Sequence, residues 1–141
     1  MVLVDTTVWI DYLRGRVSGK TEGLRSLLED GDVVCTWVIV QEILQGAAAP
    51  QKLEILRAQF MALPQLAQSL ETHVNAATLY ARCRWQGLTI RSPHDCLIAQ
   101  VAIEHGVPLL HDDRDFERMA LAEPRLSFIG DEYRRLRTRP Q

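Results

Sequence analysis

The stretch Val2-Leu3-Val4-Asp5 is a short apolar run that ends in a carboxylate, and Thr6-Thr7 and the helix-like segment 9–13 follow it. This pattern predicts a strand, an acidic residue at its carboxyl end and the start of a helix. In an open α/β sheet, ligands bind at the carboxyl ends of the strands, where helix N-termini point inward. We therefore expect Asp5 to lie on the functional edge of a parallel sheet.

The rest of the chain alternates between two apolar patterns. Helical spacing with caps predicts helices, and short β-branched runs predict strands. This alternation is typical of βα units, so we predict an α/β fold with a parallel sheet. The predicted helices cover 21–30, 38–45, 50–63, 71–86, 96–103 and 116–119, with a helical hairpin around Pro64, and the further strands cover 33–36, 107–111 and 126–129.

Length and composition predict an ordinary globular protein. The 141 residues and 16.0 kDa fit a single domain over 1–141, and 47% hydrophobic with 24% charged residues argues against disorder. The net charge of −2 gives no overall attraction to nucleic acid. Arginines nevertheless crowd the tail 131–141, and arginine suits phosphate contacts better than lysine does.

The cysteines and the hydropathy pattern predict a cytoplasmic protein. Cys35, Cys83 and Cys96 lack the spacing of a zinc site and lie in apolar or helical stretches, so we expect buried thiols in a reducing compartment. Asp5 interrupts the first apolar run, which argues against a secretory signal. No window approaches the roughly 18 apolar residues of a membrane span.

Acidic residues recur on segments that are predicted to meet at one sheet edge: Asp5, Glu42, Asp95 and the run Asp112-Asp113-Arg114-Asp115. If they converge, repulsion is about 4 kcal/mol per pair at about 4 Å and an effective dielectric of about 20. Several such pairs would rival a domain stability of about 5–15 kcal/mol. Either a cation offsets this repulsion or some of the acids stay protonated.

Each acid also has a structural explanation of its own. Asp95 lies three residues after Ser92 and can complete a capping box. Asp113 or Asp115 can cap the helix at 116–119. Glu42 can mark the solvent-exposed stripe of its helix. Asp5 is the hardest to explain in this way, so we favour convergence.

Carboxylates without histidine or thiolate partners select hard ions, so Mg²⁺ or Mn²⁺ fits better than zinc. Such an ion activates water and neutralises charge on a phosphodiester, while a carboxylate takes the proton of the water. The sequence therefore favours metal-dependent phosphodiester hydrolysis.

The segments around the acids resemble the motifs of PIN-domain ribonucleases, specifically the VapC-type toxins of prokaryotic toxin–antitoxin pairs. They occur in that family's order and at its separations, nearly end to end. Any one of these motifs is weak, but the four together are specific. They read VLVDTTVW at 2–9, VQEI at 40–43, DCLIA at 95–99 and LLHDDRDF at 109–116.

The resemblance implies a three-layer α/β/α domain with a central parallel sheet. It also implies Mg²⁺-dependent endoribonuclease activity, with Mn²⁺ as a substitute, on structured RNA such as transfer or ribosomal RNA. A small VapB-like antitoxin would inhibit the enzyme by occupying the groove over the acids. The implied assembly is a homodimer or a toxin–antitoxin hetero-oligomer.

The resemblance also assigns roles to residues. Asp5, Glu42, Asp95 and Asp113 match the family's catalytic, metal-binding quartet, and Asp115 matches a further acid often near the metal.

The motifs include three further features, namely the Thr7 hydroxyl, the closely spaced aspartates after residue 111, and Cys96. Thr7 matches a hydroxyl that hydrogen-bonds within the site. The closeness of Asp112, Asp113 and Asp115 leaves the inner ligand open, and we favour Asp113. Cys96 stands where small apolar residues are frequent in the family.

Further residues near the motifs have ordinary and functional interpretations. His94 and His111 flank acids and could support the site or contact substrate, but lone histidines are more often ordinary surface or core residues. The aromatic residues Trp9, Tyr12 and Trp37 suit the core or a dimer face better than base stacking. Loop arginines could hold an RNA backbone, namely Arg14, Arg16 and Arg91.

Competing functions fit less well. A haloacid-dehalogenase-like phosphatase would need an aspartate where Thr7 stands, and a phospho-receiver domain would need a late lysine, whereas the lysines are Lys20 and Lys52. A P-loop is excluded because no Gly-x-x-x-x-Gly-Lys run exists. The remaining alternative is a non-catalytic PIN-fold protein that binds RNA or a partner.

Overall fold

The computed structural model describes residues 1–130, so the arginine-rich tail predicted over 131–141 lies outside the described residues. Strands and helices alternate along the chain as the sequence predicts. The strands are β1 (Val2–Val4), β2 (Val33–Thr36), β3 (Gln65–Leu66) and β4 (Leu109–Leu110). The helices are α1 (Thr6–Leu13), α2 (Gly19–Asp30), α3 (Trp37–Gln45), α4 (Pro50–Met61), α5 (Leu70–Trp85), α6 (Pro93–His105) and α7 (Arg114–Ala122).

Within residues 1–130 the strands form one four-stranded sheet in the order β3-β2-β1-β4, and every pairing is parallel. The chain builds outward from β1 to β2 and β3, and it then returns to place β4 on the free side of β1. The order therefore reverses between β1 and β4. In open α/β sheets this reversal opens a crevice at the carboxyl ends of the two strands.

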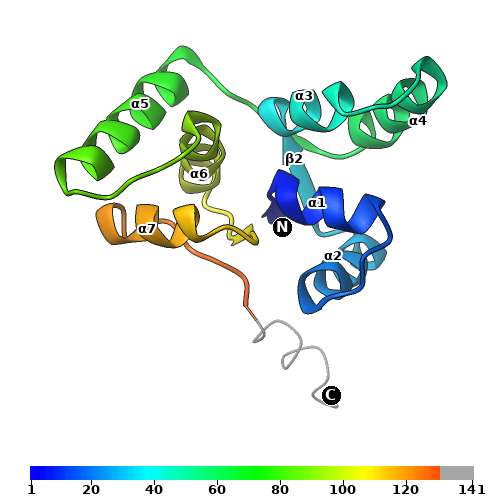
Figure 1. The fold of residues 1–141 in the computed structure, drawn as a ribbon, viewed down its shortest axis with the longest axis horizontal. Coiled ribbons are helices and arrows are strands. Elements are labelled where there is room, and N and C mark those ends of the chain that lie inside the picture. The colour runs from blue at the N-terminus through cyan, green and yellow to red at the C-terminus, as the bar shows by residue number, and fades with distance from the viewer. Residues whose placement is uncertain (131–141) are drawn as a thin grey trace.

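Helices flank the sheet in two groups (Figure 1). In the first group, α1 packs on α2 and α3, and α3 packs on α4. In the second group, α5, α6 and α7 pack on one another. Helix α6 is the central member of the second group, because the side chains from Cys96 to Ala102 are all buried. The α/β fold with a central parallel sheet is confirmed.

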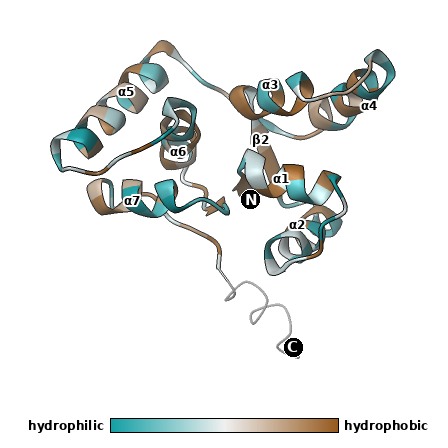
Figure 2. Ribbon diagram, viewed as in Figure 1, coloured by the Kyte–Doolittle hydropathy of each residue, from teal (hydrophilic) through white to brown (hydrophobic). Residues whose placement is uncertain are grey.

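The core follows the apolar pattern of the sequence. Leu3, Val4 and Val34 in the strands have no exposed surface, and neither does Phe116 on α7. Figure 2 shows apolar residues in brown along β2 and on α6. The cysteines are free and buried, as expected. Burying this apolar surface contributes roughly 25 cal/mol per Å² to stability. The strands that precede Asp5 and Asp113 are therefore held in the core.

Local signals define the helix ends. A capping box starts α2, in which the Ser18 and Thr21 side chains each accept a hydrogen bond from the backbone N–H of the other residue, and Gly31 ends that helix at φ 71°. Gly106 ends α6 in the same left-handed conformation, with φ 63°. Glycine adopts this conformation without the cost that a Cβ atom adds.

Two predictions about the chain around the sheet are wrong. The predicted helical hairpin around Pro64 does not form, because α4 packs on α3 while α5 packs on α6, and β3 lies between them. The position of β3 depends on a distant partner, since the backbone N–H of Cys35 donates to the Pro64 carbonyl at 2.9 Å. The predicted strand 126–129 is reduced to an isolated parallel bridge between Phe128 and Leu109.

No helix among residues 1–130 combines the length and the apolar character that crossing a membrane requires.

Candidate metal centre

Asp5 connects the end of β1 to the start of α1. Its carboxylate caps the helix by accepting hydrogen bonds from the Thr7 backbone N–H at 3.3 Å and from the Thr7 hydroxyl at 2.5 Å. Its own N–H donates to the Leu110 carbonyl of β4 at 2.9 Å. Asp5 is only 2% exposed. Asp5 is therefore fixed at the carboxyl end of β1 by its backbone contact with β4 and by its side-chain contacts with Thr7 of α1.

Glu42 reaches the same edge from α3. It is half-buried, and its Oε1 accepts a hydrogen bond from the Thr6 hydroxyl at 3.2 Å. Thr6 is the first residue of α1, so this bond joins the two helices next to Asp5. The solvent-stripe interpretation of Glu42 does not describe this contact, and sequence reasoning did not single out Thr6.

Asp95 lies in the first turn of α6, where it is half-buried. The predicted capping box with Ser92 is wrong, because the Ser92 side chain makes no capping hydrogen bond. The Asp95 N–H donates instead to the Ser92 carbonyl at 3.2 Å. The Asp95 carboxylate therefore does not serve as the reciprocal partner of a cap.

Asp113 is the N-cap of α7, directly beyond β4. Its Oδ1 accepts from the Asp115 N–H at 3.0 Å, and its own N–H donates to Nδ1 of His111 at 3.2 Å. His111 is buried between the rings of Phe116 and Phe128. Burial lowers the pKa of His111, which suits a neutral ring that accepts this bond.

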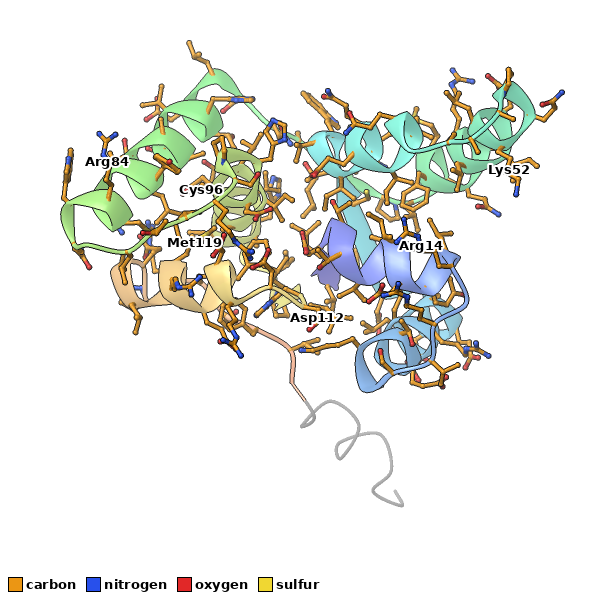
Figure 3. The ribbon with its side chains drawn as sticks, viewed as in Figure 1. Arg14, Lys52, Arg84, Cys96, Asp112 and Met119 are labelled. Carbon is orange, nitrogen blue, oxygen red and sulfur yellow. The ribbon has the colours of Figure 1, made fainter. Side chains whose placement is uncertain are left out.

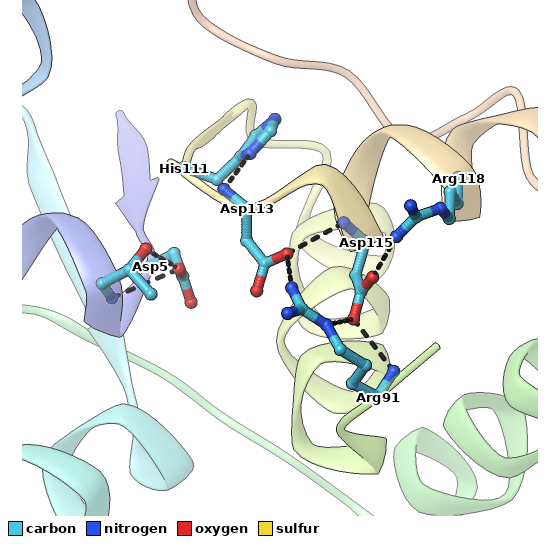
Figure 4. A network of polar contacts seen from close by, with 7 residues as sticks. Asp5, Arg91, His111, Asp113, Asp115 and Arg118 are labelled. Atoms are coloured by element: carbon cyan, nitrogen blue, oxygen red, sulfur yellow. Dashed lines mark hydrogen bonds and ion pairs between the residues drawn. The ribbon is translucent and has the colours of Figure 1, made fainter. Parts of the chain in front are cut away.

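Asp115 is fully buried, and arginine surrounds its carboxylate. Oδ1 accepts from Arg118 at 2.6 Å, while Oδ2 accepts from the Arg91 backbone N–H at 2.9 Å and from its Nε at 3.3 Å. Burial works against ionisation here, but these hydrogen bonds outweigh it and keep the pKa of Asp115 below its usual value. Figure 4 shows this network facing Asp5. The neighbouring Asp112 is exposed.

Carboxylate oxygens of Asp95, Asp113 and Asp115 all lie within 4.8 Å of one another. Asp5 and Glu42 fall outside this group, but their charges still act on it. Burial, followed by the charges of Asp5, Asp113, Glu42 and Asp115, raises the pKa of Asp95 to about 7. The structure thus brings together the acids of four separate segments.

Asp5 also carries an unfavourable charge. Burial raises its pKa to about 6, although hydrogen bonds from Thr7 and Thr6 oppose the shift and the charge of Glu42 adds to it. Within residues 1–130, no salt bridge reaches Asp5, Glu42 or Asp95. A divalent cation would satisfy this uncompensated charge, and an all-oxygen donor set fits Mg²⁺ or Mn²⁺.

The loop arginines have different surroundings. Arg16 pairs with Asp11 at 3.2 Å on the surface, and Arg14 lines a cavity that also includes Glu42. Arg91 is the loop arginine that joins the acidic network. Arg118 was not anticipated, although its position three residues after Asp115 is a helical pairing signal.

Two hollows flank the acids. One of about 620 Å³ lies between α3, α5 and α6 and is lined by Trp37, Gln41, Tyr80 and His94, among others. Its rim includes the sequence neighbours of Glu42 and Asp95. Trp37 is 54% exposed here, whereas Trp9 belongs to the core.

The second hollow, of about 480 Å³, lies between α1, α3 and α4 and is lined mostly by apolar residues together with Glu42, Arg14 and Lys52. Figure 3 shows Arg14 and Lys52 on the α1 and α4 side of the molecule.

Comparisons with known proteins agree with this geometry. The PIN domain family matches residues 2–121. The VapC ribonuclease Mb1587 of Mycobacterium bovis and the ribonuclease VapC11 of Mycobacterium tuberculosis are each 36% identical to this chain over 125 residues, which is 85% of this chain and 92% of theirs.

Solved structures show the same fold. VapBC2 from Rickettsia felis, bound to a DNA fragment from its promoter, aligns with a TM-score of 0.71 at 18% identity over 92% of this chain and 98% of that chain. FitAcB from Neisseria gonorrhoeae aligns with a TM-score of 0.65 at 17% identity over 94% and 99%.

Proposed function

The chain belongs to the PIN domain family and groups with the VapC ribonucleases, and from this membership we propose that it is a metal-dependent endoribonuclease toxin. Asp5, Glu42, Asp95 and Asp113 are its proposed catalytic and metal-binding residues. The proposal covers hydrolysis of phosphodiester bonds in structured RNA, such as transfer or ribosomal RNA, in the cytoplasm.

The observation that carries this proposal is the convergence of carboxylates around Asp95, whose oxygens lie within 4.8 Å of those of Asp113 and Asp115. Burial and the charges of the surrounding acids accordingly raise the pKa of Asp95 to about 7. Carboxylates whose pKa is raised by burial and by neighbouring acids cluster at functional sites. A hard divalent cation offsets the repulsion between these acids and also suits phosphodiester chemistry.

We assign each acidic residue a role that follows from its surroundings. Asp95 and Asp113 offer converging oxygens, and Asp5 adds a buried charge from β1. Bound Mg²⁺ would polarise the phosphodiester and lower the pKa of a water molecule. Glu42, whose Oε1 accepts a hydrogen bond from the Thr6 hydroxyl, would accept the proton of that water. Thr7 holds the Asp5 carboxylate in its orientation.

Asp115 has a different proposed role, although its oxygens lie within the metal-sized group. Both of its oxygens accept hydrogen bonds from Arg91 or Arg118, which leaves Asp113 better placed as the direct ligand. Asp115 orients Asp113 through its backbone N–H.

The flanking hollows suggest where the substrate and a partner lie. An unpaired RNA strand would lie in the hollow lined by Trp37, because the exposed Trp37 ring can stack on a base. The VapBC2 and FitAcB relatives in the solved structures suggest a small cognate VapB-like antitoxin, and possible assemblies are a homodimer or a hetero-oligomer. The apolar hollow beside Glu42 would receive an antitoxin segment that also covers the acids.

The test is digestion of total cellular RNA by the purified, partner-free protein, with Mg²⁺, with Mn²⁺ and with a chelator. Asp113→Asn is compared with Asp112→Asn, which makes the same change at the exposed neighbouring position. We expect discrete fragments with either ion and none with chelator. Asp113→Asn should lose at least about 10²-fold in rate, as for other groups that stabilise transition-state charge.

Asp112→Asn should cleave like the wild type. Equal cleavage in chelator would contradict metal dependence. If the folded wild-type protein binds Mg²⁺ but leaves every RNA intact, the non-catalytic PIN-fold alternative replaces the nuclease.

A further inference from the structure

Arg91 lies beside Asp113 and Asp115, in the loop between α5 and α6. Its Nη2 donates to Asp113 Oδ1 at 2.9 Å, and its Nε and backbone N–H donate to Asp115 Oδ2 at 3.3 and 2.9 Å. The Arg91 side chain is 71% exposed, whereas that of Asp115 is fully buried. Figure 4 shows the Arg91 guanidinium beside the carboxylates of Asp113 and Asp115.

The two contacts of Arg91 differ in how firmly they are held. The buried Asp115 carboxylate accepts hydrogen bonds from the Arg91 backbone N–H and from Nε, the guanidinium nitrogen nearest the backbone. The contact with Asp113 uses the outermost nitrogen of an exposed side chain. Exposed ion pairs of this kind are weak and exchange readily. The outer contact can therefore open while the inner one persists.

The charges identify what would open it. Arg118 also pairs with Asp115, at 2.6 Å, so the buried carboxylate already has a cationic partner without Arg91. The charge of Arg91 is shared between Asp115, at the base of the guanidinium, and Asp113, at its outer nitrogen. A divalent cation at the proposed site would compete for Asp113 and repel the nearby guanidinium. Arg91 would then carry a positive charge without a carboxylate partner at its outer end.

We propose that Arg91 is a built-in counter-ion of the acidic site that gives up Asp113 when the divalent cation binds and then contacts a phosphate of the RNA. The proposal rests on the proposed function and extends it by naming a substrate-positioning residue. Asp115 keeps the base of the side chain in place during the exchange. The released fork of N–H donors matches two phosphate oxygens, which an ammonium group does not.

The test separates metal binding from RNA cleavage. Calorimetry measures the Mg²⁺ affinity of the wild type, Arg91→Ala, Arg91→Lys and Arg84→Ala without RNA. Arg84 is an exposed arginine on α5, away from Asp112 in Figure 3, and it makes no salt bridge within residues 1–130. Thermal unfolding checks that each variant folds; Arg91→Ala retains the backbone N–H bond to Asp115.

Arg91→Ala should bind Mg²⁺ roughly two- to fivefold more tightly than the wild type, because an exposed competing ion pair is gone. Arg91→Lys keeps the charge and should stay near the wild-type affinity. Arg84→Ala should change nothing. A purely structural role for Arg91 predicts the opposite, because a disturbed site binds metal less tightly.

Cleavage is then measured under single turnover at saturating Mg²⁺, on an oligonucleotide that carries a site mapped in the total RNA digest. Arg91→Ala should be slower by roughly 10-fold or more, as when one donor to a reacting group is removed, and Arg91→Lys should lose less. The opposite signs of the metal and cleavage effects support the proposal.

If the wild-type protein cleaves RNA but Arg91→Ala binds Mg²⁺ no more tightly than the wild type, the exchange is overturned and the proposed nuclease function stands. If Arg91→Ala cleaves RNA as fast as the wild type, the phosphate contact is overturned. An inactive wild-type protein would overturn the proposed function and the RNA contact together, while the Mg²⁺ affinities would still show whether Arg91 competes with the ion.

Discussion

Asp5 illustrates how a single residue serves both folding and the site. Its carboxylate caps α1 through Thr7, which favours the fold, and at 2% exposure it also carries a charge that burial disfavours. The net effect is a pKa raised from 3.8 to about 6. The folded carboxyl therefore holds its proton more tightly than the unfolded one. The protonated Asp5 carboxyl therefore stabilises the fold at low pH, and this stabilisation is lost as the pH rises through about 6.

This behaviour predicts a stability gain when the charge is removed. In chelator at pH 8, Asp5→Asn should increase the free energy of unfolding by about 1–3 kcal/mol, since a shift of one pKa unit corresponds to about 1.4 kcal/mol. The amide oxygen can still accept the bonds from Thr7. Urea unfolding of both proteins measures the difference, which should shrink toward pH 4.

The same substitution should remove most of the stabilisation that Mg²⁺ gives to the wild-type protein. Asp112→Asn, at the exposed neighbouring position, should leave both quantities unchanged. An Asp5→Asn protein that is less stable than the wild type at pH 8 and just as responsive to Mg²⁺ would show that Asp5 is a structural cap alone.

At the scale of elements, α7 is held at both ends. Its N-terminus carries the Asp113 cap and the arginine contacts of Asp115. Beyond its C-terminus, Glu123 is buried and accepts bonds from Arg125 at 2.9 and 3.1 Å and from Arg82 of α5 at 3.2 Å. The orientation of the helix that presents Asp113 therefore depends on an ion pair outside the acidic site.

Glu123→Gln should destabilise the protein at pH 7 by about 1–2 kcal/mol, a range kept low because Arg125 is mostly exposed. The Arg125 contacts lower the pKa of Glu123 from 4.5 to about 2. The stabilisation is therefore complete above about pH 4.5 and is lost as the pH falls toward 2. Urea unfolding at pH 7 and pH 3.5 should show a smaller difference at the lower pH. An equal difference at both would rule out the charged contact.

Sequence patterns predict the elements with strong local signals and fail where distant partners decide. Helices α2 and α6 have periodic or capped segments, and their predicted ranges lie near the observed bounds. Strand β3 was missed because Gln65 and Leu66 are half-buried and show no strand pattern, and they pair only once β2 is in place. The Ser92 cap was predicted from spacing, which does not determine where a side chain turns.

At the scale of the whole molecule, the sheet order explains why the acids meet. The strand order reverses between β1 and β4, so Asp5 and the β4–α7 junction follow two neighbouring parallel strands at the same edge of the sheet. Helices α3 and α6 contact each other and carry Glu42 and Asp95. The sequence motifs are sufficient to locate these acids. The Arg118 contact has a helical spacing signal, but the Arg91 contact was beyond sequence reasoning, because Arg91 and Asp115 are neighbours only in space.

The most direct test of the central claim is the Mg²⁺ dependence of RNA cleavage by Asp95→Asn, since Asp95 is where the charges of the other acids act. The rate on a mapped RNA site is measured across Mg²⁺ concentrations for the wild type, Asp95→Asn and Asp112→Asn. The wild type and Asp112→Asn should saturate at similar rates. Asp95→Asn should remain at least about 10²-fold slower at every concentration. An Asp95→Asn protein that reaches the wild-type rate would contradict the assignment of a catalytic metal centre to these acids.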